Sequence, residues 1–393
     1  MRAFQEQVHY LQASSFPHQD GSEALEKIHN YFESFLKKLD LPSDATPAVV
    51  DQICLHSVMA LQTYTPVLGF ILRSTNVRNA FEVHHPIKRI VQKLLGPTAK
   101  VLISSEWDFV PFTYPMSLDI LSSFALVGGP ATESNNVLIL PLAGHEIGHS
   151  VWRSFNCRDV MQLKLVKSIE IVFKNNASVV SELVDDFKIG DLGEFRIKQA
   201  ILSHGIKQLE EIFCDAVGLG LFSHSFLYAY EYFMAPGGGN YRSFNYPSDL
   251  DRIRYLRIGC EKLSLSADPV LFSRWNDSVP HESMDKRVLL LLDAAVAGVA
   301  DDSIQRAVEI LIDKELAVVE LENVNRIQMS FSRGEPEDER ATIAEIVCAG
   351  WNILRTNSDK DDMGEQETHK FVGELMLKSI EISEFRKRIQ INA

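Results

Sequence analysis

The segment from Pro141 to Trp152 constrains the fold of this chain more than any other stretch of its 393 residues. It reads Pro-Leu-Ala-Gly-His-Glu-Ile-Gly-His-Ser-Val-Trp, and proline suits the first position of a helix. Residues four apart lie on one face of a helix, so the imidazoles of His145 and His149 can converge on a single metal ion. Glu146 projects about 100° further round the axis, where it can reach a water on that ion without ligating it.

Two glycines inside this predicted helix, Gly144 and Gly148, also need an explanation. Each costs roughly 1 kcal/mol relative to alanine in a helix interior, which usually indicates close packing or function. A purely structural alternative remains, in which the two histidines are core residues with satisfied hydrogen bonds. An ordinary amphipathic helix would seldom have this sequence.

A catalytic zinc ion needs a third protein ligand and one open position. The extended metzincin motif requires glycine and a further histidine where this chain has Trp152 and Phe155, so that pattern is excluded. A second helix offers carboxylates instead, because Glu211 and Asp215 stand four apart beside an apolar stripe. Glu211 could face the metal while Asp215 accepts a hydrogen bond from a ligand histidine.

The H-E-I-G-H helix followed by Glu211-x-x-x-Asp215 resembles the gluzincin metallopeptidases. The resemblance implies a zincin-like core with His145, His149 and Glu211 as zinc ligands. It implies Glu146 as the catalytic base and Asp215 as the residue that orients a ligand histidine. Glu210, His204 and His224 are fallback ligands, for which a solvated charge and surface or loop histidines are the favoured interpretations.

The stretch from Tyr246 to Ile253 is similar to the His-Pro-Pro-x-x-x-Arg-Ile stretch of the prenyl-protein endopeptidase and bacterial heat-shock membrane protease branch. Tyr246 stands where that branch has histidine, so the match is partial. The resemblance covers roughly residues 137–256. The oxyanion of the reaction needs a hydrogen-bond donor, and Tyr246, Tyr241 and His224 are the candidates; Tyr246 is the predicted catalytic one.

The periodicity predicts an α+β protein that is predominantly helical, with a small β-sheet packed on the H-E-I-G-H helix. Three regions are expected: a helical one over 1–96, the zincin-like core over 97–260 and a second helical one over 261–393. Strands are predicted at Lys100 to Trp107 and Phe124 to Gly128, the second as an edge strand for an extended peptide or as an internal strand. Core helices are predicted at about 142–155, 159–174, 206–222 and 249–258, and an earlier helix from Pro86 to Leu95.

Composition narrows the class of protein. The net charge of −14, from 53 acidic and 39 basic residues, disfavours nucleic acid and anionic lipid as partners. Five scattered cysteines without a C-x-x-C pair favour reduced thiols, and neither an export signal nor a membrane span is expected. These features predict a cytoplasmic protein.

The sequence therefore predicts a zinc-dependent metallopeptidase that hydrolyses a peptide or protein substrate. Two histidines and a carboxylate also form the facial triad of non-haem iron oxygenases, which is the less favoured chemistry. The remaining alternative is a regulatory or binding protein on a zincin scaffold, with the helical flanks contacting a protein partner.

Overall fold

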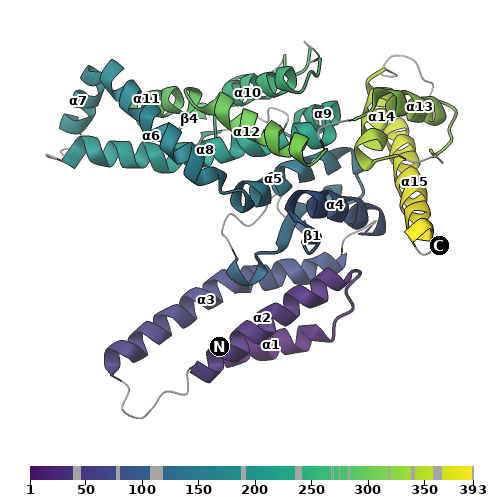
Figure 1. Cartoon of the computed structure of the whole chain (residues 1–393), viewed down its shortest axis with the longest axis horizontal. Helices are drawn as coiled ribbons and strands as arrows, with labels where there is room; N and C mark the ends of the chain where they lie inside the picture. Colours follow the sequence, from purple (N-terminus) through teal and green to yellow (C-terminus); the bar gives the residue numbers. More distant parts are fainter. Residues whose placement is uncertain are drawn as a thin grey trace. The chain divides into compact units, whose positions relative to one another are not determined.

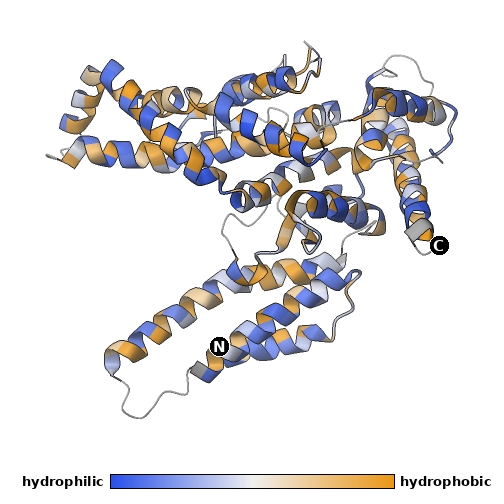
Figure 2. Cartoon of the chain, in the orientation of Figure 1, coloured by the Kyte–Doolittle hydropathy of each residue, from blue (hydrophilic) through white to orange (hydrophobic). Residues whose placement is uncertain are grey.

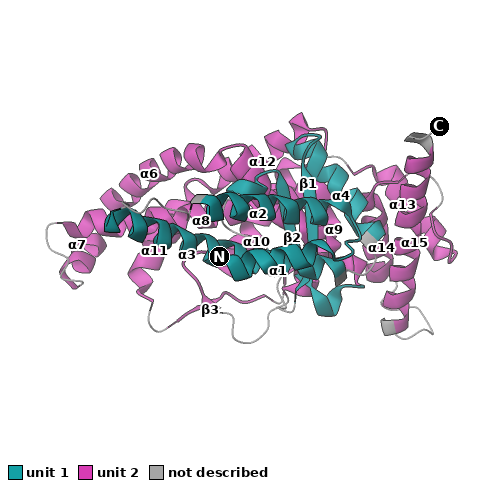
Figure 3. Cartoon of the chain, turned by 90° about the horizontal axis from the view of Figure 1, so that it is seen from below, with its two compact units in different colours: residues 1–135 teal, residues 136–393 magenta. Residues whose placement is uncertain are grey.

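The computed structural model of the chain is predominantly helical and contains two small sheets (Figure 1), which confirms the predicted α-rich α+β class. The chain divides into two compact units, unit 1 over Met1–Asn135 and unit 2 over Asn136–Ala393 (Figure 3). The structure describes residues 1–38, 46–76, 80–106, 118–186, 192–234, 241–266, 268, 270–273, 275–281, 284–316, 319–337, 341–356 and 365–391.

Unit 1 combines four helices with a pair of parallel strands among its described residues. Its elements are α1 (Arg2–Gln12), α2 (Gln19–Lys38), α3 (Pro47–Arg73), α4 (Ala80–Leu95), β1 (Lys100–Glu106) and β2 (Phe124–Pro130), with short 3-10 turns at Ser74–Asn76, Asp119–Leu121 and Ala131–Glu133. The strands pair in register from Lys100 opposite Phe124 to Glu106 opposite Pro130. Apolar side chains of α1, α2, α3 and both strands form one core, which includes Leu25, Phe32 and Phe70.

Helix α3 is, among the described helices, the one that is long and apolar enough to cross a membrane by length and composition. Apolar residues recur along it (Figure 2). Its C-terminal half supplies Val67, Phe70 and Ile71 to the unit 1 core, whereas Leu55 and Met59 are exposed. Only 39% of its most apolar window is buried. Core helices pass the same test of composition, so the expectation of no membrane span stays a prediction.

Unit 2 is built almost entirely from helices. They are α5 (Ala143–Ser154), α6 (Cys157–Asn175), α7 (Ala177–Asp186), α8 (Gly193–Phe222), α9 (His224–Phe233), α10 (Asp249–Lys262), α11 (Lys286–Ala297), α12 (Ala300–Asp313), α13 (Leu321–Ser332), α14 (Ile343–Thr356) and α15 (Glu365–Ile391). A 3-10 turn over Val137–Leu142 leads into α5, and the two-residue strands β3 (Tyr241–Arg242) and β4 (Val279–Pro280) pair in parallel.

Helix α8 is the centre of unit 2. It contacts α5, α6, α9, α10, α11 and α12, and almost every residue from Ile212 to Phe222 is buried. A helix that is apolar on most sides is stable only where neighbours cover it, and here they do so on every side of its C-terminal half. Asn156 adopts the left-handed conformation between α5 and α6, with φ at 49°. Asparagine tolerates that conformation better than most residues, so the chain can turn sharply after α5.

Several predicted boundaries were wrong. Helix α4 begins at Ala80 and carries Pro86 inside it, whereas the sequence suggested that Pro86 would start the helix. Helix α8 begins at Gly193, thirteen residues before the predicted start. Pro141 lies within the 3-10 turn, so α5 starts two residues after it.

Both predicted strands form. β1 ends at Glu106, and Trp107 lies outside the described residues. The strands belong to unit 1 and the H-E-I-G-H helix to unit 2, so the sheet's packing on that helix and the role of β2 as a peptide edge stay predictions. The borders of the predicted core at 97 and 260 also stay predictions.

Candidate metal centre

Helices α5 and α8 approach each other closely because small residues line both contact faces. A Cβ atom on Gly144 would lie 2.9 Å from the Cα of Gly218, and one on Gly148 would lie 2.7 Å from the Cα of Cys214. Those separations are shorter than real Cβ contacts allow. The expectation that these glycines serve close packing is therefore confirmed, and the pairing shows that the two helices run antiparallel at this contact.

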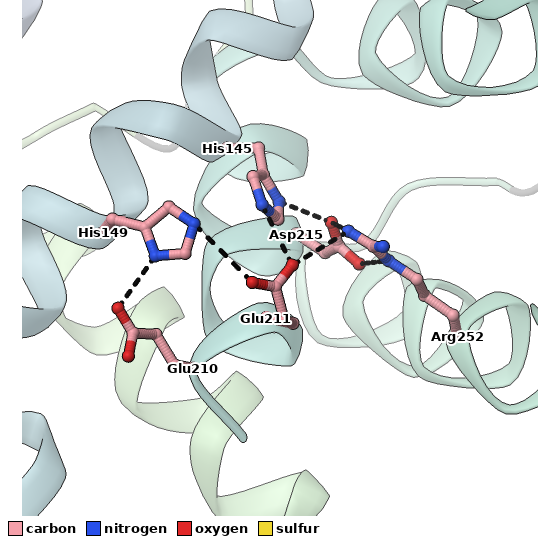
Figure 4. A network of polar contacts seen from close by, with 6 residues as sticks. All are labelled: His145, His149, Glu210, Glu211, Asp215 and Arg252. Carbon is pink, nitrogen blue, oxygen red and sulfur yellow. Dashed lines mark hydrogen bonds and ion pairs between the residues drawn. The ribbon is translucent and has the colours of Figure 1, made fainter. Parts of the chain in front are cut away.

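The two motif histidines project from α5 toward one carboxylate of α8. Their rings are 5.1 Å apart and nearly perpendicular. The Nε2 atom of His145 lies 3.3 Å from one oxygen of Glu211, and the Nε2 atom of His149 lies 3.8 Å from the other. Figure 4 shows Glu211 between the two rings. The structure thus brings together the three predicted ligands.

The opposite ring nitrogens have carboxylate partners of their own. The Nδ1 atom of His145 lies 2.8 Å from Asp215, and the Nδ1 atom of His149 lies 2.8 Å from Glu210. A carboxylate beside Nδ1 holds the proton on that atom, which leaves the Nε2 lone pair of each histidine free for a metal. Asp215 therefore has the contact expected of it. Glu210, predicted to be a solvated charge, instead binds His149.

Arg252 on α10 holds this arrangement from one side. Its guanidinium donates to both oxygens of Asp215, at 2.6 and 2.9 Å, and lies 3.6 Å from Glu211. It also lies over the ring of Tyr230, with 5.1 Å to the centroid. Burial would raise the pKa of Asp215, but the charge and hydrogen bonds of Arg252, together with the contact to His145, hold that pKa far below its usual range. Asp215 is therefore a permanent carboxylate.

The charges of the centre balance one another. Burial would lower the pKa of His145, but hydrogen bonds to Asp215 and Glu211 raise it to about 10. Burial likewise opposes the charge of Glu211, whose pKa is nevertheless lowered by its bond to His145 and by Arg252. Without a metal, a proton on His145 thus balances the carboxylates. Two imidazoles and a carboxylate are donors that zinc accepts, so the residues fit that ion.

Glu146 lies beside these groups and is 5% exposed. Among the described residues none hydrogen-bonds its carboxylate. Burial raises its pKa, and the nearby His145 and His149 pull in the opposite direction. A nearly buried carboxylate with free lone pairs and a raised pKa is suited to exchanging a proton with a water in the same space.

Cys214 is a residue of this centre that the sequence did not single out. One donor atom each of His145, His149 and Cys214 lie within 4.8 Å of one another, so these three could also hold a metal ion. Burial raises the pKa of the thiol well above its usual value, and the charge of Glu210 adds to this. Its position could have pointed to it, because Cys214 stands one helical turn after Glu210 and directly before Asp215.

Tyr246 follows β3 in a segment fixed to the surrounding helices. The Gln208 side chain donates to the carbonyl of Phe244 at 2.9 Å, and Arg242 donates to the carbonyl of Tyr246. The charge of Glu211, followed by burial, raises the pKa of Tyr246, and its side chain is 48% exposed. Tyr246 therefore lies in the electrostatic field of the centre and remains open to solvent.

The other candidates have partners elsewhere. His204 bonds Asn245 at 2.8 Å, and His224 bonds the carbonyl of Ser266 at 2.6 Å. Tyr241 is 68% exposed and lies edge-on to His281. None of these contacts reaches the two motif histidines.

Comparison with known proteins adds no assignment, because no family model, no curated protein and no solved structure matches this chain.

Proposed function

We propose that the chain is a zinc-dependent metallopeptidase that hydrolyses peptide bonds in a peptide or protein substrate. One observation carries the proposal: the Glu211 carboxylate faces the Nε2 atoms of both His145 and His149, at 3.3 and 3.8 Å. Three such donors on one side leave room for a water and a substrate oxygen on the other. The unbonded carboxylate of Glu146 beside them supports a hydrolytic role.

His145, His149 and Glu211 would hold the zinc ion, which would supply a Lewis acid and lower the pKa of a bound water toward 7. Glu146 would act as the general base that takes a proton from the attacking water. The same carboxyl group, whose pKa burial raises, then returns the proton to the leaving amine. The hydroxyl of the half-exposed Tyr246 is the proposed donor to the carbonyl oxygen as negative charge develops there.

Glu211 is the favoured third ligand over Cys214. The Glu211 oxygens face both Nε2 atoms, whereas Cys214 is fully buried at the α5–α8 contact, where a Cβ atom on Gly148 would lie 3.0 Å from its Sγ atom. Binding of metal to the thiol would also require the loss of a proton that burial retains. Zinc content of Glu211→Ala and Cys214→Ala proteins separates the two sets of ligands. We expect the first substitution to lower zinc content strongly and the second to leave it near one equivalent.

The proposed reaction is tested by peptide hydrolysis with wild type and Glu146→Gln protein, both with measured zinc content. We expect the glutamine variant to keep zinc and to lose at least about 100-fold in rate, the usual contribution of a general base. Equal hydrolysis by both proteins at equal zinc content would end the proposal. A mixture of short peptides of varied sequence serves as substrate, with cleavage followed by mass spectrometry.

A further inference from the structure

Both ring nitrogens of His149 face carboxylates that belong to consecutive residues of α8. Nε2 lies 3.8 Å from Glu211, and Nδ1 lies 2.8 Å from Glu210. The imidazole is thus held between two consecutive glutamates. Only the one on Nδ1 forms a hydrogen bond of normal length, and it leaves Nε2 directed at Glu211 (Figure 4).

We propose that Glu210 is the positioning residue of His149: it fixes the ring's orientation and keeps the proton on Nδ1, so that the site retains its metal. This inference rests on the proposed zinc site. Glu210 does not touch the metal or the substrate in this role. It acts through the histidine, as Asp215 does for His145.

The geometry of two antiparallel helices explains why each histidine has its own carboxylate. At 1.5 Å per residue, His145 and His149 are separated by about 6 Å along α5, and Glu210 and Asp215 by about 7.5 Å along α8. The contacts of Gly144 with Gly218 and of Gly148 with Cys214 fix the register. His149 therefore meets Glu210, and His145 meets Asp215.

The two carboxylates differ in their surroundings, which makes their roles separable. The Asp215 side chain is 5% exposed and is held by the buried Arg252, so its removal disturbs the packing of α10 as well. The Glu210 side chain is 22% exposed, and the charge of Arg153 on α5 lies close to it. Loss of Glu210 leaves the part-buried guanidinium of Arg153 without this charge, whereas loss of Asp215 leaves the ion pair of Arg252 broken at a deeply buried position. Metal retention should therefore change more than folding does in Glu210→Ala.

Zinc affinity of full-length protein, measured by competition with a chromophoric chelator, tests this role. We expect Glu210→Ala to bind zinc about 10–100-fold more weakly than wild type, the usual cost of losing such a partner. Glu210→Gln should recover most of the affinity, because its amide oxygen can accept the same hydrogen bond. Glu194→Ala is the matched control: this glutamate lies on the same helix, is 57% exposed and pairs with Lys198. It should bind zinc as wild type does.

A second readout separates positioning from a general structural effect. In zinc-loaded wild type the Nδ1 proton of His149 should exchange slowly enough to be seen by NMR, and in Glu210→Ala it should be lost to solvent exchange. The metal-free proteins should differ in stability by no more than about 1.5 kcal/mol, or roughly tenfold in the unfolding equilibrium constant, the usual contribution of one hydrogen bond. Wild-type affinity and an unchanged Nδ1 signal in Glu210→Ala would overturn the inference.

The design also distinguishes failure of the inference from failure of the proposed function. If Glu211→Ala abolishes zinc binding while Glu210→Ala leaves it intact, the zinc site stands and only the positioning role falls. If wild type binds no zinc, or His145→Ala binds it as tightly as wild type, the proposed function fails and the inference fails with it.

Discussion

At the scale of single residues, the centre depends on a glycine without a side chain as much as on the histidines and carboxylates. Gly148 has no side chain, and this lets the backbone of α5 come near enough for its histidines to reach Glu211. The convergence of His145 and His149 could be predicted from their spacing, since residues four apart share a helix face. The contact of Glu210 with His149 could not, because it depends on the register at which α8 packs against α5.

Gly148→Ala should destabilise the protein by about 1–3 kcal/mol, because the new Cβ atom would lie 2.7 Å from the Cα of Cys214 and would force the helices apart. Zinc content should fall with it. Gly373→Ala on α15 is the control, since a Cβ atom there meets nothing within 4 Å. It should stabilise the protein by about 1 kcal/mol. Chemical denaturation measures both, and equal effects of the two substitutions would contradict the packing argument.

Arg252→Leu should cost about 3–5 kcal/mol, because it leaves the Asp215 carboxylate buried without its ion-pair partner. Arg254→Leu removes the same charge from the same helix, but the Arg254 side chain is 56% exposed. That substitution should change the free energy of unfolding by no more than about 0.5 kcal/mol. Urea unfolding of the two variants beside wild type gives the comparison.

At the scale of elements, strong periodicity predicted which helices and strands form better than it predicted where they begin and end. The motif helix and the strands were found nearly where expected, whereas α8 runs thirteen residues further toward the N-terminus. Its first turns carry Glu194, which pairs with Lys198 four residues later, and Lys198 also pairs with Glu170 of α6. The second pair is a tertiary contact that only the folded chain reveals. Likewise, the sequence around His84 on α4 did not indicate that His18, which precedes α2, would stack on it.

Helix α4 provides a pH dependence in unit 1. His84 is 4% exposed and stacks on His18 at 3.7 Å, with Asp20, His85 and Lys88 around it. Burial, followed by the charge of His18, lowers its pKa to about 3. The unfolded chain takes up this proton near pH 6.5, while the folded chain does not, so stability is complete above pH 6.5 and falls as the pH drops toward 3.

His84→Phe should therefore weaken the loss of stability between pH 6.5 and 4. The measurement is the unfolding midpoint in urea at a series of pH values, with wild type in parallel. Parallel pH profiles for the two proteins would show that this histidine does not contribute.

At the scale of the whole molecule, the two units should respond differently to metal. The proposed ligands all belong to unit 2, and the core of unit 1 contains none of them. The compact units meet at Asn135 and Asn136, and the three regions expected from the sequence stay a prediction. Periodicity reports local helix and strand faces, whereas the grouping of elements depends on contacts between distant segments.

Removal of zinc with a chelator should lower the unfolding temperature of unit 2 and leave that of unit 1 unchanged. A ligand present at about 1,000 times its dissociation constant stabilises the folded state by about 4 kcal/mol. Differential scanning calorimetry of the full chain, with and without chelator, should show one of two transitions shifting. A shift of both by the same amount would contradict the assignment of the metal to unit 2 alone.

The six residues from Glu210 to Asp215 put every acidic contact of the two histidines on one stretch of a single rigid helix. These carboxylates therefore move as one unit with α8, and a rearrangement of a surface loop cannot move one of them away from the histidines alone. Displacing α5 along α8 by one residue would break all of the contacts at once. If the proposed ion binds here, its release should accordingly be concerted and should require α5 to slide along α8.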